Sequence, residues 1–256
     1  MLVTALVGLG AAPSAFGLFE IHQFVTKAGD HSATATCPSG YHVVSGGGQT
    51  GVIPATMGQT ALNASRKSGN GWTVRGFSFH DHQTTPSHNF KVTAYAYCSQ
   101  RNFHLNTFTD TATGTPRVTT PVNCGSGHVV SGGGAVTSMY GVAFLDARRP
   151  NGWKFGADAT SDGGSMLPAT TQAAAYCTPD PYHLATAKAS GTVQANHIAS
   201  KTAHCPQGTT LVSGGGDAGA SPYDITWYSR KQENGWRITV TNGPMPTTLT
   251  AYAYCH

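Results

Sequence analysis

The chain has 256 residues, of which only 10% are charged, and its formal net charge is +4. So few charges exclude a disordered polyelectrolyte, and a net charge this small does not indicate a nucleic-acid partner. There are 32 glycines and only two glutamates, while Thr, Val and Tyr are abundant. Such a composition favours short strands and turns over long helices, so we predict an all-β protein.

The N-terminal segment is apolar and then rich in small residues. Residues 1–17 read MLVTALVGLGAAPSAFG, a pattern typical of the latter part of a secretory signal peptide, although the basic start is missing. The alternative is a buried first strand. No later run of about 18 apolar residues follows, so we expect a secreted, extracellular protein without a membrane span.

Four landmarks recur three times in the same order, at intervals of roughly 80 residues, which is the signature of an internal repeat. A cysteine opens a motif that ends in Ser-Gly-Gly-Gly: CPSGYHVVSGGG at 37–48, CGSGHVVSGGG at 124–134 and CPQGTTLVSGGG at 205–216. Asn-Gly-Trp follows, and AYAYC or AAAYC closes each copy. We therefore place three repeats at 18–99, 100–179 and 180–256.

The six cysteines fall into one pair per repeat. Spacing alone allows many pairings, but the first cysteine of each repeat precedes a strand and the second ends one. If these strands are antiparallel neighbours, the predicted bridges are Cys37 with Cys98, Cys124 with Cys177, and Cys205 with Cys255. Each would close a loop of about 50 to 60 residues and stabilise the fold by about 4 kcal/mol. Disulfides indicate an oxidising compartment, and the alternative of a metal site lacks a C-x-x-C pair.

Several strands can be placed within each repeat. The first repeat should have strands near 21–26, 42–45, 60–65, 72–79 and 94–97, with counterparts of the first near 103–104 and 182–183. Asn-Gly between apolar strands predicts a hairpin, and the glycine triplet suits a bulge or a close backbone approach. We expect three tandem β-sheet repeats with internal pseudo-threefold symmetry (β-prism-like) and one disulfide per repeat; three separate small sandwiches are the alternative.

The Cys-Pro-x-Gly, Gly-Gly-Gly, Asn-Gly-Trp and Tyr-x-Cys landmarks together resemble a module of secreted actinobacterial and phage-associated proteins. The second copy departs from the pattern at Gly125, which replaces Pro, and at Ala174, which replaces Tyr. The resemblance implies an exported β-module and brings no catalytic residues with it.

The sequence offers little for catalysis. There is no G-x-S-x-G elbow, and the repeated Ser45, Ser131 and Ser213 share one context, which indicates a scaffold role. Acids are few and none recurs across the repeats, which argues against a paired-carboxylate mechanism. We therefore expect no catalytic residues and a non-catalytic protein.

A basic pair precedes the Trp of each repeat. These are Arg66-Lys67 before Trp72, Arg148-Arg149 before Trp153, and Arg230-Lys231 before Trp236. Arg next to aromatic residues suits glycans through bidentate hydrogen bonds and ring stacking. The alternative is a solvated hairpin tip above a Trp that fills the core. Trp227 occurs in the third repeat alone and joins the predicted ligand-binding set.

Histidines form two further candidate sites. The first repeat carries a His-rich insertion whose His80, His82 and His88 suit Zn or Cu; an exposed loop is the alternative. One histidine opens each repeat, at His22, His104 and His183. These could share an ion on the axis, although structural hydrogen bonding is the more common role. We expect no other cofactor.

Together these features favour a secreted, non-catalytic protein that binds cell-surface or other extracellular polysaccharide through repeated Arg/Trp hairpin tips, because several weak sites gain avidity on a repetitive polymer. Two alternatives stay open. One is a structural subunit that self-assembles into an extracellular coat or fibre. The other is a metal-dependent enzyme that uses the His-rich insertion.

Overall fold

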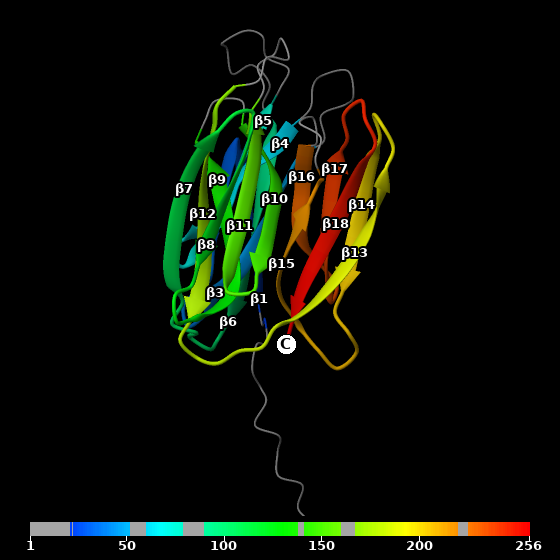
Figure 1. The fold of residues 1–256 in the computed structure, drawn as a ribbon. Helices are drawn as coiled ribbons and strands as arrows, with labels where there is room; N and C mark the ends of the chain where they lie inside the picture. Colours follow the sequence, from blue (N-terminus) through cyan, green and yellow to red (C-terminus); the bar gives the residue numbers. More distant parts are fainter. Residues whose placement is uncertain are drawn as a thin grey trace, which may run out of the picture.

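The structure is a computed structural model, and it describes residues 21, 23–51, 60–78, 90–137, 141–159, 167–219 and 225–256. Over these residues the chain forms strands and turns, with no helix (Figure 1). The all-β prediction is therefore confirmed. The candidate signal peptide at 1–17 lies outside the described residues.

The strands form three six-stranded sheets, in which neighbouring strands pair antiparallel. Sheet A has the order β1 (Gln23–Asp30), β6 (Lys91–Ser99), β3 (His42–Thr50), β16 (Ile225–Gln232), β17 (Gly235–Thr241) and β14 (Ile198–His204). Sheet B has the order β2 (Ser32–Thr36), β5 (Gly71–Ser78), β4 (Thr60–Ser68), β9 (His128–Val136), β12 (Ala169–Thr178) and β7 (Asn106–Gly114). Sheet C has the order β13 (Ala185–Val193), β18 (Thr247–Cys255), β15 (Leu211–Asp217), β10 (Gly141–Arg149), β11 (Gly152–Ala159) and β8 (Arg117–Asn123).

Each sheet is shared by two repeats. Repeat 1 joins repeat 2 where β4 pairs with β9, repeat 2 joins repeat 3 where β10 pairs with β15, and repeat 3 returns to repeat 1 where β16 pairs with β3. Each of these junctions consists of only two residue pairs, whereas the pairings within a repeat are long. The strand pairing therefore runs in a closed cycle through all three repeats, so the three repeats are not independent sandwiches.

Within a repeat, three strands of one sheet pack against three strands of another. The apolar residues between them form three main core clusters. The predicted disulfides Cys37–Cys98, Cys124–Cys177 and Cys205–Cys255 are all present. In repeat 1 the bridge runs from the segment after β2 to β6, and Val43 of β3 is the antiparallel partner of Cys98. Three disulfides indicate an oxidising environment.

The glycine triplet provides close backbone approaches on three sides. In repeat 2 a β-carbon at Gly132 would overlap the ring of Trp153, and one at Gly134 would overlap the ring of Phe155. A β-carbon at Gly133 would collide with the carbonyl oxygen of Ser65, which belongs to repeat 1. In each of the other two triplets the neighbours are again the Trp ring, a carbonyl oxygen of another repeat, and an apolar side chain, which is Val74 or Ile238. The middle glycine is therefore required by the junction between repeats.

The serine before each triplet joins the three repeats. Ser45 Oγ donates to the carbonyl oxygen of Val212 at 2.6 Å, and the Oγ atoms of Ser131 and Ser213 make the equivalent bonds at 2.6 and 2.7 Å. Their acceptors are the carbonyl oxygens of Val44 and Val130. All three serines are buried, and a bulge opens the strand beside each one. This ring of bonds accounts for the serines as scaffold.

The strand prediction was wrong at two kinds of place. Residues 103–104 and 182–183 do not form strands, and β7 and β13 begin a few residues later. Phe103 and Tyr182 are buried in one core cluster, and His104 has a positive φ of 46°, which a strand does not allow. The strands β2, β8 and β14 were not predicted, since they are short and their alternation of polar and apolar residues is weak.

No helix in the described part of the chain is long and apolar enough to cross a membrane.

Candidate binding surface

The basic pairs lie on the arms of the predicted hairpins, just before the turns. In repeat 1 the turn is formed by residues 68–71, and Arg66 and Lys67 pair across the hairpin with Thr73 and Trp72. The Asn of Asn-Gly-Trp binds the cysteine loop: the carbonyl oxygen of Asn70 accepts from the Cys37 N–H at 2.9 Å. Asn151 and Asn234 make the same bond to Cys124 and Cys205. The hairpins are therefore fixed to the disulfides.

The basic pair of repeat 2 is shifted by one residue along the sequence relative to the pairs of repeats 1 and 3. The backbone N–H groups of Lys67, Arg148 and Lys231 each donate to a tyrosine hydroxyl of the neighbouring repeat, at 2.7, 2.7 and 2.8 Å. These three residues are therefore equivalent, and each precedes its Trp by the same distance in the sequence. The position of Arg66 and Arg230 is thus occupied by Ala147 in repeat 2.

The tyrosines of these bonds are buried, and they also contact the neighbouring Trp rings edge-on. Tyr176 meets Trp72, Tyr254 meets Trp153 and Tyr97 meets Trp236, with ring centroids 5.6 to 5.8 Å apart. Burial raises the pKa of each tyrosine well above its ordinary value, so the hydroxyls stay protonated. They serve as contacts between repeats.

Trp72, Trp153 and Trp236 must be removed from the predicted ligand-binding set. Their exposed fractions are 1%, 0% and 2%. Each ring lies against the first glycine of its own triplet and donates its indole N–H to a polar side chain seven residues earlier. Because no ring face is open to a ligand, the core interpretation accounts for all three. The side chain of Trp227, on β16, lies outside the part of the chain that is described.

Sheet A carries a group of arginines and tyrosines at the junction of repeats 3 and 1. The guanidinium of Arg230 lies 4.6 Å from the ring centroid of Tyr95 and 4.7 Å from that of Tyr228. Arg237 is the register partner of Arg230 and lies 5.6 Å from the same Tyr228 ring. We call these four residues the Arg–Tyr cluster. The side chains of Tyr228, Arg230 and Arg237 are half-buried, so part of each remains open to solvent.

The other basic residues have different surroundings. Arg66 donates to Gln172 Oε1 at 2.5 Å across the junction of repeats 1 and 2. Arg148 donates to the carbonyl oxygen of Leu184 at 3.0 Å, and burial lowers the pKa of its guanidinium. Burial also lowers the pKa of Lys231, whereas Arg149 is exposed. The basic pairs of the three repeats therefore have different surroundings, and the pair of repeat 3, on sheet A, is the one beside the tyrosines of the Arg–Tyr cluster.

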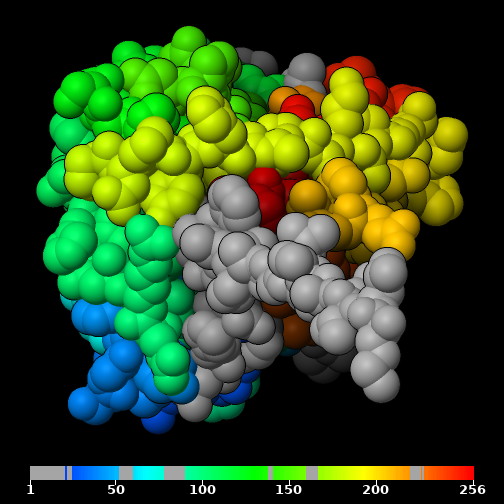
Figure 2. Space-filling model, turned by 90° about the horizontal axis from the view of Figure 1, so that it is seen from below, coloured from blue at the N-terminus to red at the C-terminus, as the bar shows by residue number. Residues whose placement is uncertain are grey.

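A groove of about 630 Å³ opens beside the hairpin turn of repeat 1. Its lining includes His42, Lys67, Asn102, His104 and Asn106. The segment that connects repeats 1 and 2 forms one wall. This end of the molecule is seen in Figure 2, where the connector from repeat 2 to repeat 3 crosses the face in yellow.

The predicted metal sites are only partly described. His80, His82, His88 and His22 lie outside the described residues. His104 and His183 are exposed, and His183 faces His128 with ring centroids 6.4 Å apart. Among the residues that the structure describes, no group of three or more His, Cys, Asp or Glu could hold a metal ion.

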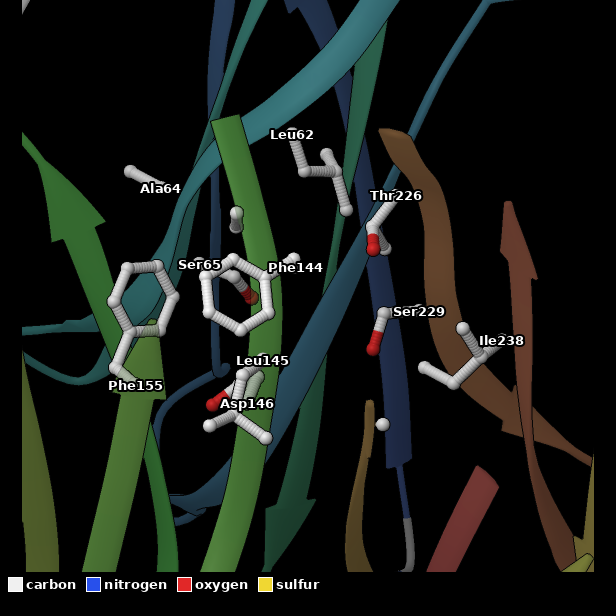
Figure 3. A pocket seen from close by; sticks show the side chains of 12 residues that line it. Leu62, Ala64, Ser65, Phe144, Leu145, Asp146, Phe155, Thr226, Ser229 and Ile238 are labelled. Atoms are coloured by element: carbon white, nitrogen blue, oxygen red, sulfur yellow. The ribbon is translucent and has the colours of Figure 1, made fainter. Parts of the chain in front are cut away.

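A cavity of about 20 Å³ lies where β4, β10 and β16 meet (Figure 3). Ser65, Asp146 and Ser229 line it from equivalent positions, and each accepts the indole N–H of its own repeat's Trp. Burial raises the pKa of the Asp146 carboxyl to about 7. The lining is otherwise largely apolar, and the space suits a single water molecule.

No protein-family model matches this chain, and no curated protein resembles it in sequence. The resemblance to a secreted module therefore stays a prediction.

The two tyrosines of the Arg–Tyr cluster could not be found from the sequence. Tyr95 and Tyr228 lie in different repeats, and nothing in their spacing brings them to one arginine. The offset of Arg148, by contrast, was visible in its constant distance from Trp153.

Proposed function

We propose that the protein is a secreted, non-catalytic binding protein for an acidic extracellular polysaccharide, such as a cell-wall polymer that carries carboxylate or phosphate groups. The observation that carries this proposal is the Arg–Tyr cluster, in which the Arg230 guanidinium lies near Tyr95 and Tyr228. Arg237 beside it already donates to Gln232 Oε1 and Ser200 Oγ and adds positive charge, so Arg230 is the arginine that would meet the anion. Arginine forks bind carboxylate and phosphate bidentately, and contact with aromatic rings holds the guanidinium in place.

We further propose that the three repeats surround a pseudo-threefold axis as one β-prism-like unit. The cyclic order of the strand junctions supports this arrangement, as do the serine and tyrosine bonds that pass from each repeat to the next. In such a unit, Arg66 on sheet B and the exposed Arg149 on sheet C supply further cations on the other two sheets. A long polymer could engage more than one of them and gain avidity.

Polymer sedimentation tests this function on the full chain. The protein should sediment with insoluble polygalacturonate at low ionic strength and much less at about 0.5 M salt, because added salt screens exposed charges. Highly methyl-esterified polygalacturonate keeps the same sugar and removes the charge, so it serves as the matched control. Equal binding to both polymers, or no binding to either, would overturn the proposal.

A further inference from the structure

Sheet C carries a groove of about 660 Å³ on which none of the sequence predictions fell. The lining includes residues of five strands: Arg117 and Thr119 from β8, Lys154 from β11, Phe144 from β10, Asp217 from β15 and Thr248 from β18. The segment 245–248, at the start of β18, forms one side. The volume is within the range of small-molecule sites, which are concave and place a few polar groups on a partly apolar lining.

Lys154 is the uncommitted cation of this groove. Its side chain makes no hydrogen bond or ion pair with any residue that the structure describes, although it is half-buried. Its cross-strand partner is Pro121, which offers no side-chain acceptor. At the equivalent place in repeat 1, Thr73 bonds to its cross-strand partner Thr34 at 2.7 Å. The sheet therefore leaves Lys154 without the partner that its counterpart has.

Arg117, the second cation, is already engaged. Its guanidinium lies 3.5 Å from the ring centroid of Phe144 and donates to the carbonyl oxygen of Gly219. Its Nε lies 3.8 Å from a carboxylate oxygen of the buried Asp158. These contacts hold Arg117 and Phe144 in the groove as a fixed wall, which leaves Lys154 to meet an anion.

Asp217 supplies an acceptor in the same groove. One carboxylate oxygen accepts from the Gly219 N–H at 2.9 Å, and no ion pair joins the carboxylate to Lys154. The equivalent residues of repeats 1 and 2 are Gln49 and Ala135, so the carboxylate is particular to this sheet. A cation and a carboxylate that line one groove without pairing suit a ligand that carries both an anionic group and hydroxyl donors.

The remaining side of the groove is an exposed apolar ledge. Met245 has an exposed fraction of 54%, and Pro246 beside it is also exposed. An apolar ledge opposite convergent polar groups fits the two sides of a sugar ring, one mostly C–H and the other mostly hydroxyl. Thr119 and Thr248 add hydroxyls to the polar side.

We infer that this groove is a binding site for one uronate unit, with the sugar carboxylate on Lys154, ring hydroxyls donating to Asp217, and the ring against Met245 and Pro246. The inference rests on the proposed function, because it names the sugar that a polymer would present. It adds a site on sheet C that is separate from the Arg–Tyr cluster on sheet A.

The test is an NMR titration of the full chain, which measures the affinity for digalacturonate and for its methyl ester. The wild type should bind the acid at least about fivefold more tightly than the ester. Lys154→Gln should remove that preference, and Asp217→Asn should weaken both ligands by a similar factor, because hydroxyl donors are present in both. Lys188→Gln removes an exposed cation from β13 of the same sheet and should change neither affinity.

The possible outcomes separate the two proposals. A Lys154→Gln variant that keeps the preference for the acid would overturn the groove assignment, as would the absence of any digalacturonate binding. If polygalacturonate still sediments the protein in either case, the polymer-binding function stands without the groove. Conversely, digalacturonate binding that depends on Lys154, in a protein that does not bind the polymer, would support the groove and contradict the proposed function.

Discussion

The indole N–H of Trp153 donates to the carboxyl group of Asp146, at the position where Trp72 and Trp236 donate to serine hydroxyls. All three acceptors line the same small cavity, so one carboxyl group stands where the repeat pattern has a hydroxyl. The cavity lining is largely apolar, and burial raises the pKa of this carboxyl to about 7. This departure from the repeat gives the fold a titratable group between its three repeats.

The first prediction concerns the pH dependence of stability. The folded-state pKa of Asp146 is above its unfolded value, so the native state favours the protonated carboxyl. This contribution to stability is present below about pH 4 and is lost as pH rises toward about 7, by up to about 4 kcal/mol. Asp146→Ser, which restores the residue of the other repeats, should remove this loss.

The measurement is urea unfolding of wild type and Asp146→Ser at several values between pH 4 and pH 8. The neighbouring Tyr176 and Tyr254 stay neutral throughout, because burial raises their pKa. The free-energy difference between the two proteins should change with pH in the predicted direction. A difference that is constant over this range would show that the carboxyl does not titrate there.

The second prediction tests the serine ring. Ser45→Ala, Ser131→Ala and Ser213→Ala each remove one buried hydrogen bond to the next repeat and leave a carbonyl oxygen without its donor. Each should lower the free energy of unfolding by about 1–3 kcal/mol, with similar values for the three. Polymer binding at temperatures well below unfolding should be unchanged. Loss of binding in a stable variant would mean that the serines are functional rather than scaffold.

The third prediction tests the junction between repeats. Gly133→Ala places a β-carbon against the Ser65 carbonyl, where β9 meets β4. Neither backbone can move freely, so the free energy of unfolding should fall by about 3 kcal/mol. Gly114→Ala at the end of the edge strand β7 is the control, because its nearest neighbours would lie at 3.2 Å and need to shift only slightly. Comparable losses in thermal unfolding would contradict the role of the middle glycine.

The fourth prediction concerns the disulfides. Replacing Cys124 and Cys177 together by serine opens a loop with a sequence separation of 53 residues. The free energy of unfolding should fall by about 4 kcal/mol on the loop-entropy account. Since each repeat has its own bridge, Cys37–Cys98 and Cys205–Cys255 should still form, as peptide mapping under non-reducing conditions can check. Scrambled bridges in this variant would show that the pairing is not set repeat by repeat.

The sequence predicted the local structure of each repeat well. Cysteine order, the Asn-Gly turns and the Ala/Tyr alternation identified the disulfides, the hairpins and the strand that carries Cys98. These features depend on residues close together or on one strand, where spacing translates directly into geometry. The close approaches at the triplets were also predicted, since only glycine permits them. The bulge, by contrast, lies at Val44, before the serine, and not at the glycines.

The sharing of sheets between repeats could not be predicted in this way. The pairing of β16 with β3 depends on two residue pairs, Tyr228 with Gln49 and Ser229 with Gly48, separated by most of the chain. No periodicity records such a contact. The sequence also suggested Trp236 as a ligand-binding ring, because the pattern does not show that Gly214 of the same repeat lies directly against it. The Arg–Tyr cluster is a product of this junction and was therefore not visible either.

The central claim is that the Arg–Tyr cluster binds an acidic polysaccharide, and affinity electrophoresis through soluble polygalacturonate tests it most directly. We expect the double variant Arg230→Gln/Arg237→Gln to lose at least about tenfold in affinity, as removing charge-assisted bonds predicts. A double variant of equal charge, Arg101→Gln/Lys188→Gln, removes exposed cations away from the cluster and should retain nearly full affinity. Equal retardation of the two double variants would contradict the claim.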